Sequence, residues 1–186
     1  MLMVELDDEK AWISKCQQGD HEAFELLIKR YQHMIHSLTF RMTGSVAEAE
    51  DLAQDTFIQA FRQIGGYRAE ARLSSWLYRI AVNLCLNWQK RQHRRERLYS
   101  DWSQQQELSN HPDHRRNQQI QDALLKLSPK QRAAIILTTY DGLNHAEAAR
   151  ALGCSETTIS WRLFAARAKL KRLLSNVHFK EVQHEG

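Results

Sequence analysis

The stretch that decides the fold is NHAEAARALGCSETTISWRLFAARAKLKRL, residues 144–173. Asn144 and Glu147 have the spacing of a helix-capping box, and Gly153 is the residue type that ends a helix in a left-handed turn. Ser155 then caps a second helix immediately after that turn. Two helices joined by so short a turn form a helix-turn-helix, whose second helix enters the major groove of DNA.

The second helix of this motif carries cations and no acid. Five basic residues and no acidic one lie between Thr158 and Arg172. Residues such as Ile159 and Leu163 have helical spacing and predict a buried inner face. A stripe of Thr158, Arg162, Ala165, Lys169 and Arg172 is expected to face outward. A solvated helix usually mixes both charge signs, so this one predicts contacts with phosphates and bases. The candidate duplex-binding residues are Thr157, Thr158, Trp161, Arg162, Phe164, Arg167 and Lys169.

Helical periodicity extends along most of the remaining chain. Asp20 is placed to cap a long helix that ends at Gly44, and Ser45 begins another that stops at Gly65-Gly66. A third long helix carries an apolar face from Leu73 onward. The sequence contains only seven glycines and two prolines, which favours helices over a turn-rich β architecture.

These patterns predict an all-α protein of two small helical domains. The N-terminal helical bundle is expected to span residues 8–97, and the C-terminal helix-turn-helix domain residues 118–176. Between them, residues 98–117 are polar, rich in glutamine and without a sustained period. We interpret this segment as a flexible linker.

An acidic patch opens the second helix of the N-terminal domain. Four acids and no cation lie between Ser45 and Thr56, and Glu48, Asp51 and Asp55 share the face opposite Phe57. An acidic ridge on a protein that otherwise binds DNA is expected to meet a basic protein. The alternative is that acids simply favour a helix N-terminus.

The third helix has the opposite character. Five cations and one acid lie in residues 90–97, and cationic and amide side chains line the face opposite Trp76 and Trp88. Together with Tyr67 and Tyr78, which are expected to be exposed, they suit single-stranded or opening DNA. The alternative is that Trp76 and Trp88 belong to the core. The candidates for unpaired DNA are Tyr67, Trp76, Arg79, Asn83, Asn87, Lys90 and Arg91.

Composition excludes several other classes. The three cysteines are far apart, which argues against a disulfide framework or a cysteine-based zinc site. The first residues lack the pattern of a signal peptide, and no stretch is apolar enough to span a membrane. We therefore expect a cytoplasmic protein that neither inserts into membranes nor binds a small-molecule substrate. No catalytic residue, metal or cofactor is predicted.

Four segments together resemble the extracytoplasmic-function (ECF) sigma factors, the small two-domain class of bacterial RNA polymerase sigma subunits. They are GDHEAFELLIKRYQHMI (19–35), AEAEDLAQDTFIQAF (47–61), ARLSSWLYRIAVNLCLNWQKR (71–91), and the C-terminal segment 127–170. Their order and spacing cover nearly the whole chain.

The resemblance implies a role for each candidate surface. Glu48, Asp51, Gln54 and Asp55 would bind core RNA polymerase at the coiled-coil clamp helices of its β′ subunit, with the β subunit also a partner. Asn83 and the loop 67–75 would form a pocket for a flipped base of the −10 promoter element. The basic C-terminal helix would bind the −35 element. An anti-sigma factor is implied as a further partner.

The sequence departs from its relatives in the C-terminal helix. Many relatives carry cations where Ser160 and Ala165 stand, a small residue at Trp161, and glycine at Thr157. Trp161 has two interpretations: contact with thymine methyl groups, or packing on the preceding helix.

Two rival functions are open from the residues alone. A stand-alone helix-turn-helix regulator explains the C-terminal motif but leaves the acidic ridge and the basic third helix unexplained. A metal-dependent enzyme would need ligands such as His33 with His36, or His111 with His114. His33 and His36 lack a carboxylate or other third ligand at a suitable spacing, and the other pair lies in the expected linker.

Overall fold

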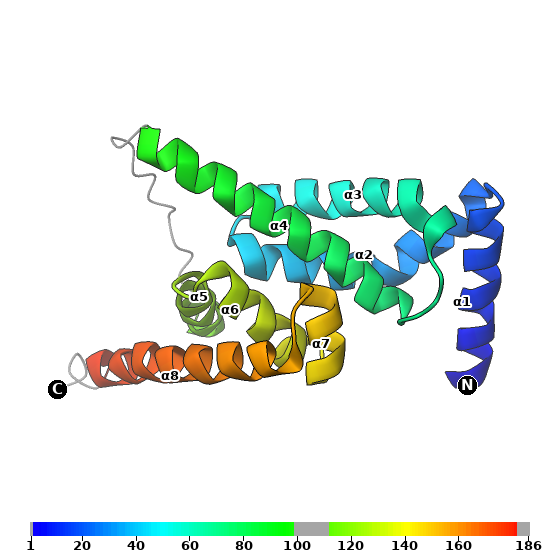
Figure 1. Ribbon diagram of the computed structural model, residues 1–186. Coiled ribbons are helices and arrows are strands. Elements are labelled where there is room, and N and C mark those ends of the chain that lie inside the picture. The colour runs from blue at the N-terminus through cyan, green and yellow to red at the C-terminus, as the bar shows by residue number, and fades with distance from the viewer. Residues whose placement is uncertain (1, 99–111, 182–186) are drawn as a thin grey trace.

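The computed structural model describes residues 2–98 and 112–181, and its regular elements are all helical (Figure 1). This confirms the all-α prediction. In chain order the elements are α1 (Leu2–Gln17), α2 (His21–Thr43), α3 (Val46–Gln63), the 3-10 turn η1 (Ile64–Gly66), α4 (Leu73–Leu98), α5 (Pro112–Leu125), α6 (Pro129–Ile135), the π-helical turn η2 (Ile136–Tyr140), α7 (His145–Leu152) and α8 (Glu156–Glu181).

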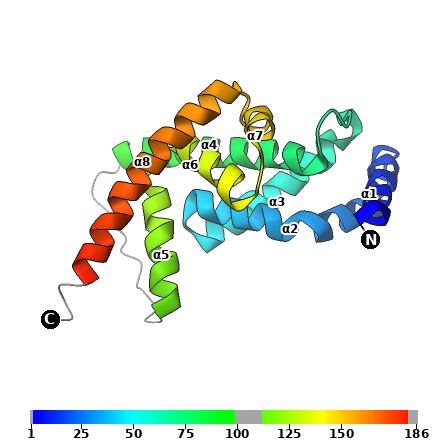
Figure 2. The same ribbon diagram turned by 90° about the horizontal axis from the view of Figure 1, so that it is seen from below.

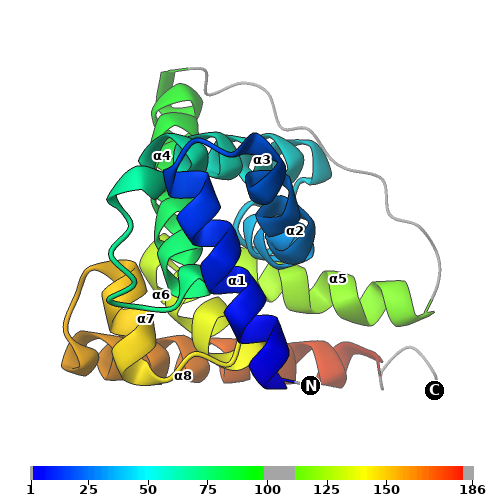
Figure 3. The same cartoon turned by 90° about the vertical axis from the view of Figure 1, so that its right-hand side faces the viewer.

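The N-terminal helices α2, α3 and α4 lie side by side, and α1 crosses one end of them (Figures 1 and 3). The Asp20 carboxylate accepts a hydrogen bond from the Ala23 N–H at 3.0 Å and thus caps α2. Gly44 ends this helix in the left-handed conformation, with φ of 77°. Both ends of α2 are therefore set by residues whose local chemistry predicted them.

The C-terminal helices contain the expected helix-turn-helix, made by α7 and α8. Asn144 and Glu147 form a complete capping box at α7, and Gly153 closes that helix with φ of 57°. The Ser155 hydroxyl accepts from the Thr158 N–H at 3.2 Å, which caps α8. Figure 2 shows α8 as a long helix running past α5 and α6.

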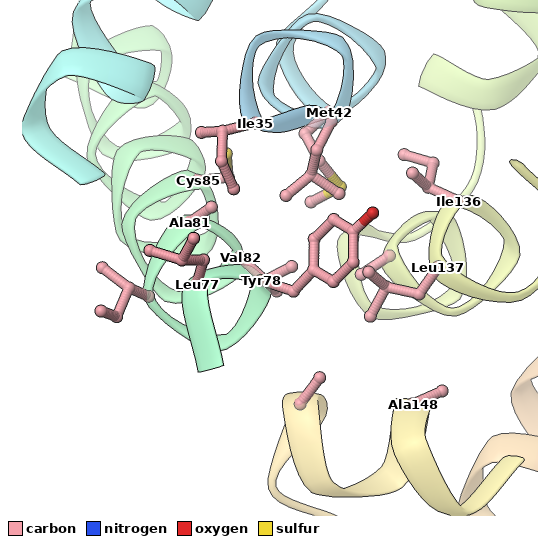
Figure 4. Packing of buried hydrophobic residues seen from close by; sticks show 14 of the residues in the cluster. Ile35, Met42, Leu77, Tyr78, Ala81, Val82, Cys85, Ile136, Leu137 and Ala148 are labelled. Carbon is pink, nitrogen blue, oxygen red and sulfur yellow. The ribbon is translucent and has the colours of Figure 1, made fainter. Parts of the chain in front are cut away.

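The two groups of helices share one hydrophobic core. Figure 4 shows the Tyr78 ring of α4 between Met42 of α2 and Leu137 of η2, with Ala148 of α7 below. Tyr78 is only 3% exposed. The expectation that Tyr78 is an exposed platform for bases is therefore wrong, because helices distant in sequence cover this face of α4.

Polar side chains also join the two groups. The Gln121 amide of α5 donates to the Phe40 and Arg41 carbonyl oxygens of α2 at 3.2 and 3.3 Å. The Arg41 guanidinium lies 4.4 Å from the centre of the Tyr140 ring. The C-terminal helices are thus docked on the end of α2 by hydrogen bonds and a cation–π contact as well as by apolar packing.

The expected linker differs from the structure at its C-terminal end. Helix α5 already begins at Pro112, inside the segment 98–117. Proline fits the first position of a helix because its missing N–H has no helical partner there. Residues 99–111 lie outside the described residues.

Candidate nucleic-acid interface

The acidic ridge, which we define as Glu48, Asp51, Gln54 and Asp55, lies on α3. The Ser45 hydroxyl accepts from the Glu48 N–H and starts the helix. Buried Leu52 and Thr56 fix the inner face, with the Thr56 hydroxyl donating to the Leu52 carbonyl at 2.7 Å. Asp51, Gln54 and Asp55 are consequently exposed, and Glu48 is half-buried.

An apolar groove of about 870 Å³ runs beside the ridge, between α2 and α3. Its wall includes Phe24, Phe57 and the exposed Ile58, and Gln54 belongs both to the groove and to the ridge. Sequence reasoning missed this groove. The available signal was that Ile58 lies off the predicted buried face of its helix, but helical spacing does not show that a groove lies between two helices.

The cationic and amide side chains of α4 share one exposed face. Arg79, Asn83, Asn87 and Lys90 follow one another at helical spacing, and all four are exposed. Arg91, at the edge of this face, is exposed too. Donors to base edges and cations for phosphates are therefore presented together along the helix.

A pocket of about 420 Å³ lies at the start of this face. It is lined in part by Tyr67 and Trp76, whose ring centroids are 5.3 Å apart. The Tyr67 hydroxyl donates to the Ala71 carbonyl, and the Gln17 amide donates to the Tyr67 carbonyl at 2.8 Å. The loop that carries Tyr67 is therefore pinned at two points, and both aromatic rings are half-buried.

This pocket includes residues from the C-terminal helices. Arg150 and Ala151 of α7 complete its wall beside Arg79 of α4. Ala69, in the loop of the pocket, has a φ of 56°, a left-handed conformation that is uncommon for residues other than glycine. The pocket thus combines an aromatic pair, cations and a locally strained loop.

The structure corrects the predicted outer stripe of α8. Thr158, Arg162, Ala165 and Lys169 are half-buried, and only Arg172 of that stripe is exposed. The face that points away from the protein carries Thr157, Ser160, Trp161, Phe164, Arg167, Ala168 and Lys171, all of them exposed. The exposed stripe lies one residue before the predicted one along the helix. The buried face of α8 is wider than helical spacing alone indicates, and it covers one side of the predicted stripe.

Two of the predicted cations make hydrogen bonds to other groups of the chain. Arg162 donates to the Cys154 sulfur at 3.3 Å, and Lys169 donates to the Lys126 carbonyl at 2.6 Å. Trp161, in contrast, does not pack on the preceding helix, since it is 70% exposed. Of the three cations among the candidate duplex-binding residues, Arg167 is the one that the structure leaves exposed.

No group of three or more potential metal-ligating side chains was found among the residues that the structure describes. His33 is exposed and His36 half-buried, whereas His111 lies outside the described residues. Cys16 and Cys85 are buried, Cys154 is half-buried, and all three are free thiols. Burial raises the pKa of Cys85 to about 12, so this thiol is not an activated nucleophile. Within the described ranges, no helix is both long and apolar enough to span a membrane.

Comparison with known proteins identifies both halves of the chain. The family model of Sigma-70 region 2 matches residues 27–95, and that of Sigma-70, region 4 matches residues 117–170. The ECF RNA polymerase sigma factor SigM of Mycobacterium tuberculosis is 37% identical over 164 residues, covering 84% of this chain and 79% of SigM. The chain belongs to the ECF sigma factors. The ECF RNA polymerase sigma-E factor of Escherichia coli is 31% identical over 179 residues, covering 89% of this chain and 93% of that protein.

A solved structure agrees with this ECF sigma factor in fold. The sigma factor RpoE of Bartonella quintana, determined in complex with the anti-sigma factor NepR, has a TM-score of 0.69 and 30% identity, covering 82% of this chain and 96% of RpoE. Sigma factors are transcription initiation factors and not enzymes. The two-region match rules out the stand-alone regulator, because such a protein would lack region 2.

Proposed function

We propose that this ECF sigma factor uses three surfaces in one initiation complex. The acidic ridge binds core RNA polymerase, the exposed face of α4 captures the −10 element as it opens, and the outer face of α8 binds the −35 duplex. The observation that carries the proposal is the separation of charge: exposed carboxylates on α3, and exposed cations on α4 and α8.

The acidic ridge supports a basic protein partner and not DNA. Asp51 and Asp55 are exposed one turn apart, so they would repel phosphates. The groove next to them adds apolar area, as a stable protein interface requires. This combination fits the clamp helices of the β′ subunit, with further contacts to the β subunit. Gln54 lies where the groove and the ridge meet.

The exposed face of α4 supports binding of unpaired bases. Arg79, Asn83, Asn87, Lys90 and Arg91 offer amide groups to base edges and cations to the backbone of a single strand. The pocket of Tyr67 and Trp76 adjoins this face and is of a size to admit a flipped base. Unstacking a base costs roughly a few kcal/mol. Capture of the flipped base in the pocket offsets this cost and thereby favours promoter opening.

The outer face of α8 supports duplex binding. Thr157, Trp161, Phe164 and Arg167 point away from the core, in the first turns of the second helix of a helix-turn-helix. Thr158, Arg162 and Lys169 lie on its flank, where they position the helix.

The relatives suggest where this chain acts and what controls it. RpoE was solved with an anti-sigma factor, and the fold shared with RpoE supports an anti-sigma partner for this chain as well. Since its proposed partners are RNA polymerase and promoter DNA, we place its activity in the cytoplasm. Neither region alone is expected to bind a promoter tightly, because polymerase supplies the geometry that engages both at once.

Charge reversal on the ridge tests the proposal. Asp51→Lys with Asp55→Lys should weaken association with core polymerase by about a hundredfold, because like charges would then face each other. Asp8→Lys with Glu22→Lys makes the same change in net charge at exposed sites away from the ridge, and should leave association within about twofold. Affinity is measured by fluorescence titration of labelled chain with core polymerase. Equal affinities of the two double variants would contradict the assignment.

A further inference from the structure

Trp161 and Phe164 are exposed in a way that packing does not explain. They are 70% and 74% exposed, and none of the other large apolar residues whose side chains the structure describes exceeds 57%. They lie three residues apart on α8, so they are neighbours on one helix face. Two adjacent aromatic rings in water mark a binding surface more often than single exposed apolar residues do.

The rotation of α8 fixes where these rings point. Ile159, Leu163 and Ala166 are at most 1% exposed and face the core. Trp161 and Phe164 must therefore project on the opposite side. Both lie in the first turns of α8, the part of a recognition helix that contacts base edges.

The two polar side chains next to Trp161 in sequence already make contacts within the protein. The Ser160 hydroxyl donates to the Glu156 carbonyl at 3.1 Å and lies 3.1 Å from Nδ1 of His145. Arg162 is held by the Cys154 sulfur. The most accessible contact surface in this part of the helix is therefore apolar.

Charge selects DNA over protein as the occupant of this surface. The sequence has no acidic residue from Thr157 to Arg172, and Arg167, Lys171 and Arg172 are exposed. Cations around an aromatic pair match a groove flanked by phosphates. The major groove presents one apolar group, the C5 methyl of thymine.

We propose that Trp161, with Phe164 beside it, recognises thymine methyl groups in the −35 duplex and so makes this sigma factor prefer thymine at the base pairs it faces. The inference rests on the proposed function of α8 as the −35 reader. Its specificity would then come from burial of methyl groups and not from hydrogen bonds to bases. The loss of one such contact is expected to lower affinity about fourfold.

The test uses the full chain bound to core RNA polymerase and a promoter library with a randomised upstream duplex. Each thymine selected by this holoenzyme is replaced in turn by deoxyuridine, which lacks only the methyl group. We expect about a fourfold loss of holoenzyme affinity at one or two positions. Trp161→Ala should lose both the thymine preference and the sensitivity to deoxyuridine at those positions.

The control is Leu174→Ala, which removes another exposed apolar side chain from the same helix. It should keep both the thymine preference and the deoxyuridine effect. Because Trp161 is exposed, its variant should unfold at the same urea concentration as the parent chain.

The outcomes distinguish failure of the thymine-recognition inference from failure of the proposed −35 role of α8. Selection of an upstream element without any deoxyuridine effect would overturn the inference and leave the −35 role of α8 intact. The same holds if Trp161→Ala loses affinity equally for all sequences. Failure of the holoenzyme to select any upstream element would overturn both.

Discussion

Arg132 joins the two groups of helices, and its replacement by methionine gives a quantitative test of that junction. The side chain is only 6% exposed. Its guanidinium donates to the carbonyl oxygens at the end of α5 and to one carbonyl near the end of α2. The acceptors are Leu124 at 2.8 Å, Leu125 at 2.6 Å, Leu127 at 3.3 Å, and Met42.

The magnitude follows from these bonds. The last carbonyls of a helix have no partner within the helix, so a buried cation satisfies several of them together. A hydrogen bond from a charged group contributes about 1.5–3 kcal/mol, and removing the guanidinium also removes the cost of burying it. We expect Arg132→Met to lower the free energy of unfolding by about 3 kcal/mol, which corresponds to a fall in Tm of roughly 6–12 °C for a chain of this length.

Urea-induced unfolding followed by circular dichroism measures this difference. The matched control is Lys130→Met, which removes an exposed cation from the same helix and should change stability by less than about 0.5 kcal/mol. Arg132→Lys keeps the charge but not the fork of donors, so its loss should fall between the two. If Arg132→Met were as stable as the Lys130 control, the bridging role of Arg132 would be wrong.

Three further predictions concern single sites. Asn83→Ala should slow promoter opening about tenfold on duplex DNA, since one hydrogen bond to a captured base is lost; stopped-flow fluorescence measures this, and an equal defect on a pre-melted template would argue against base capture. Arg167→Ala should reduce the slope of log affinity against log salt by about 0.9, the value for one phosphate contact, whereas exposed Lys15→Ala should leave that slope unchanged; an unchanged slope for Arg167→Ala would remove it from the interface. Burial raises the pKa of Asp141 to about 6, despite the opposing effects of Arg41 and a hydrogen bond from Tyr78. The folded state then holds the proton that the unfolded state has lost between about pH 4 and pH 6, so this group should make the protein about 1 kcal/mol more stable at pH 5 than at pH 7. The Asp141→Asn variant should lack this extra stability at pH 5 when its free energy of unfolding is measured by urea titration at both pH values. If the variant keeps the pH profile of the parent chain, Asp141 is not the source of the effect.

Local chemistry made much of this fold predictable. Asp20, Gly44, Asn144 and Gly153 sit at the helix ends that their side chains or backbone preferences indicate, and each is found in that role. Such signals act within a few residues, so the sequence alone carries them. The helix-turn-helix is therefore predictable from the sequence alone.

Contacts between distant segments were not predictable in this way. In the sequence, Tyr78 belongs to a basic helix and was expected to be exposed. In the structure it is buried, because η2 and α7 pack over it. Arg162 and Lys169 were expected to face DNA, but each finds an acceptor within the protein. Helical spacing gives the angle between side chains, but it does not give the width of the face that neighbouring helices cover.

The groove between α2 and α3 shows the same limit. Phe24 and Phe57 have the spacing of core residues, and both are buried, yet they also form the wall of an open surface. Whether an apolar residue closes a core or lines a groove depends on the distance between helices. That distance is a property of the packed structure.

The most direct test of the whole account is in vitro transcription with core RNA polymerase that lacks its own specificity subunit, on a library of genomic fragments. With the purified chain added, we predict transcripts that start at a small set of sites sharing two upstream elements, and no such starts without it. Start sites that are absent, or that are distributed in the same way with and without the chain, would contradict the assignment of this protein as a promoter-selecting sigma factor.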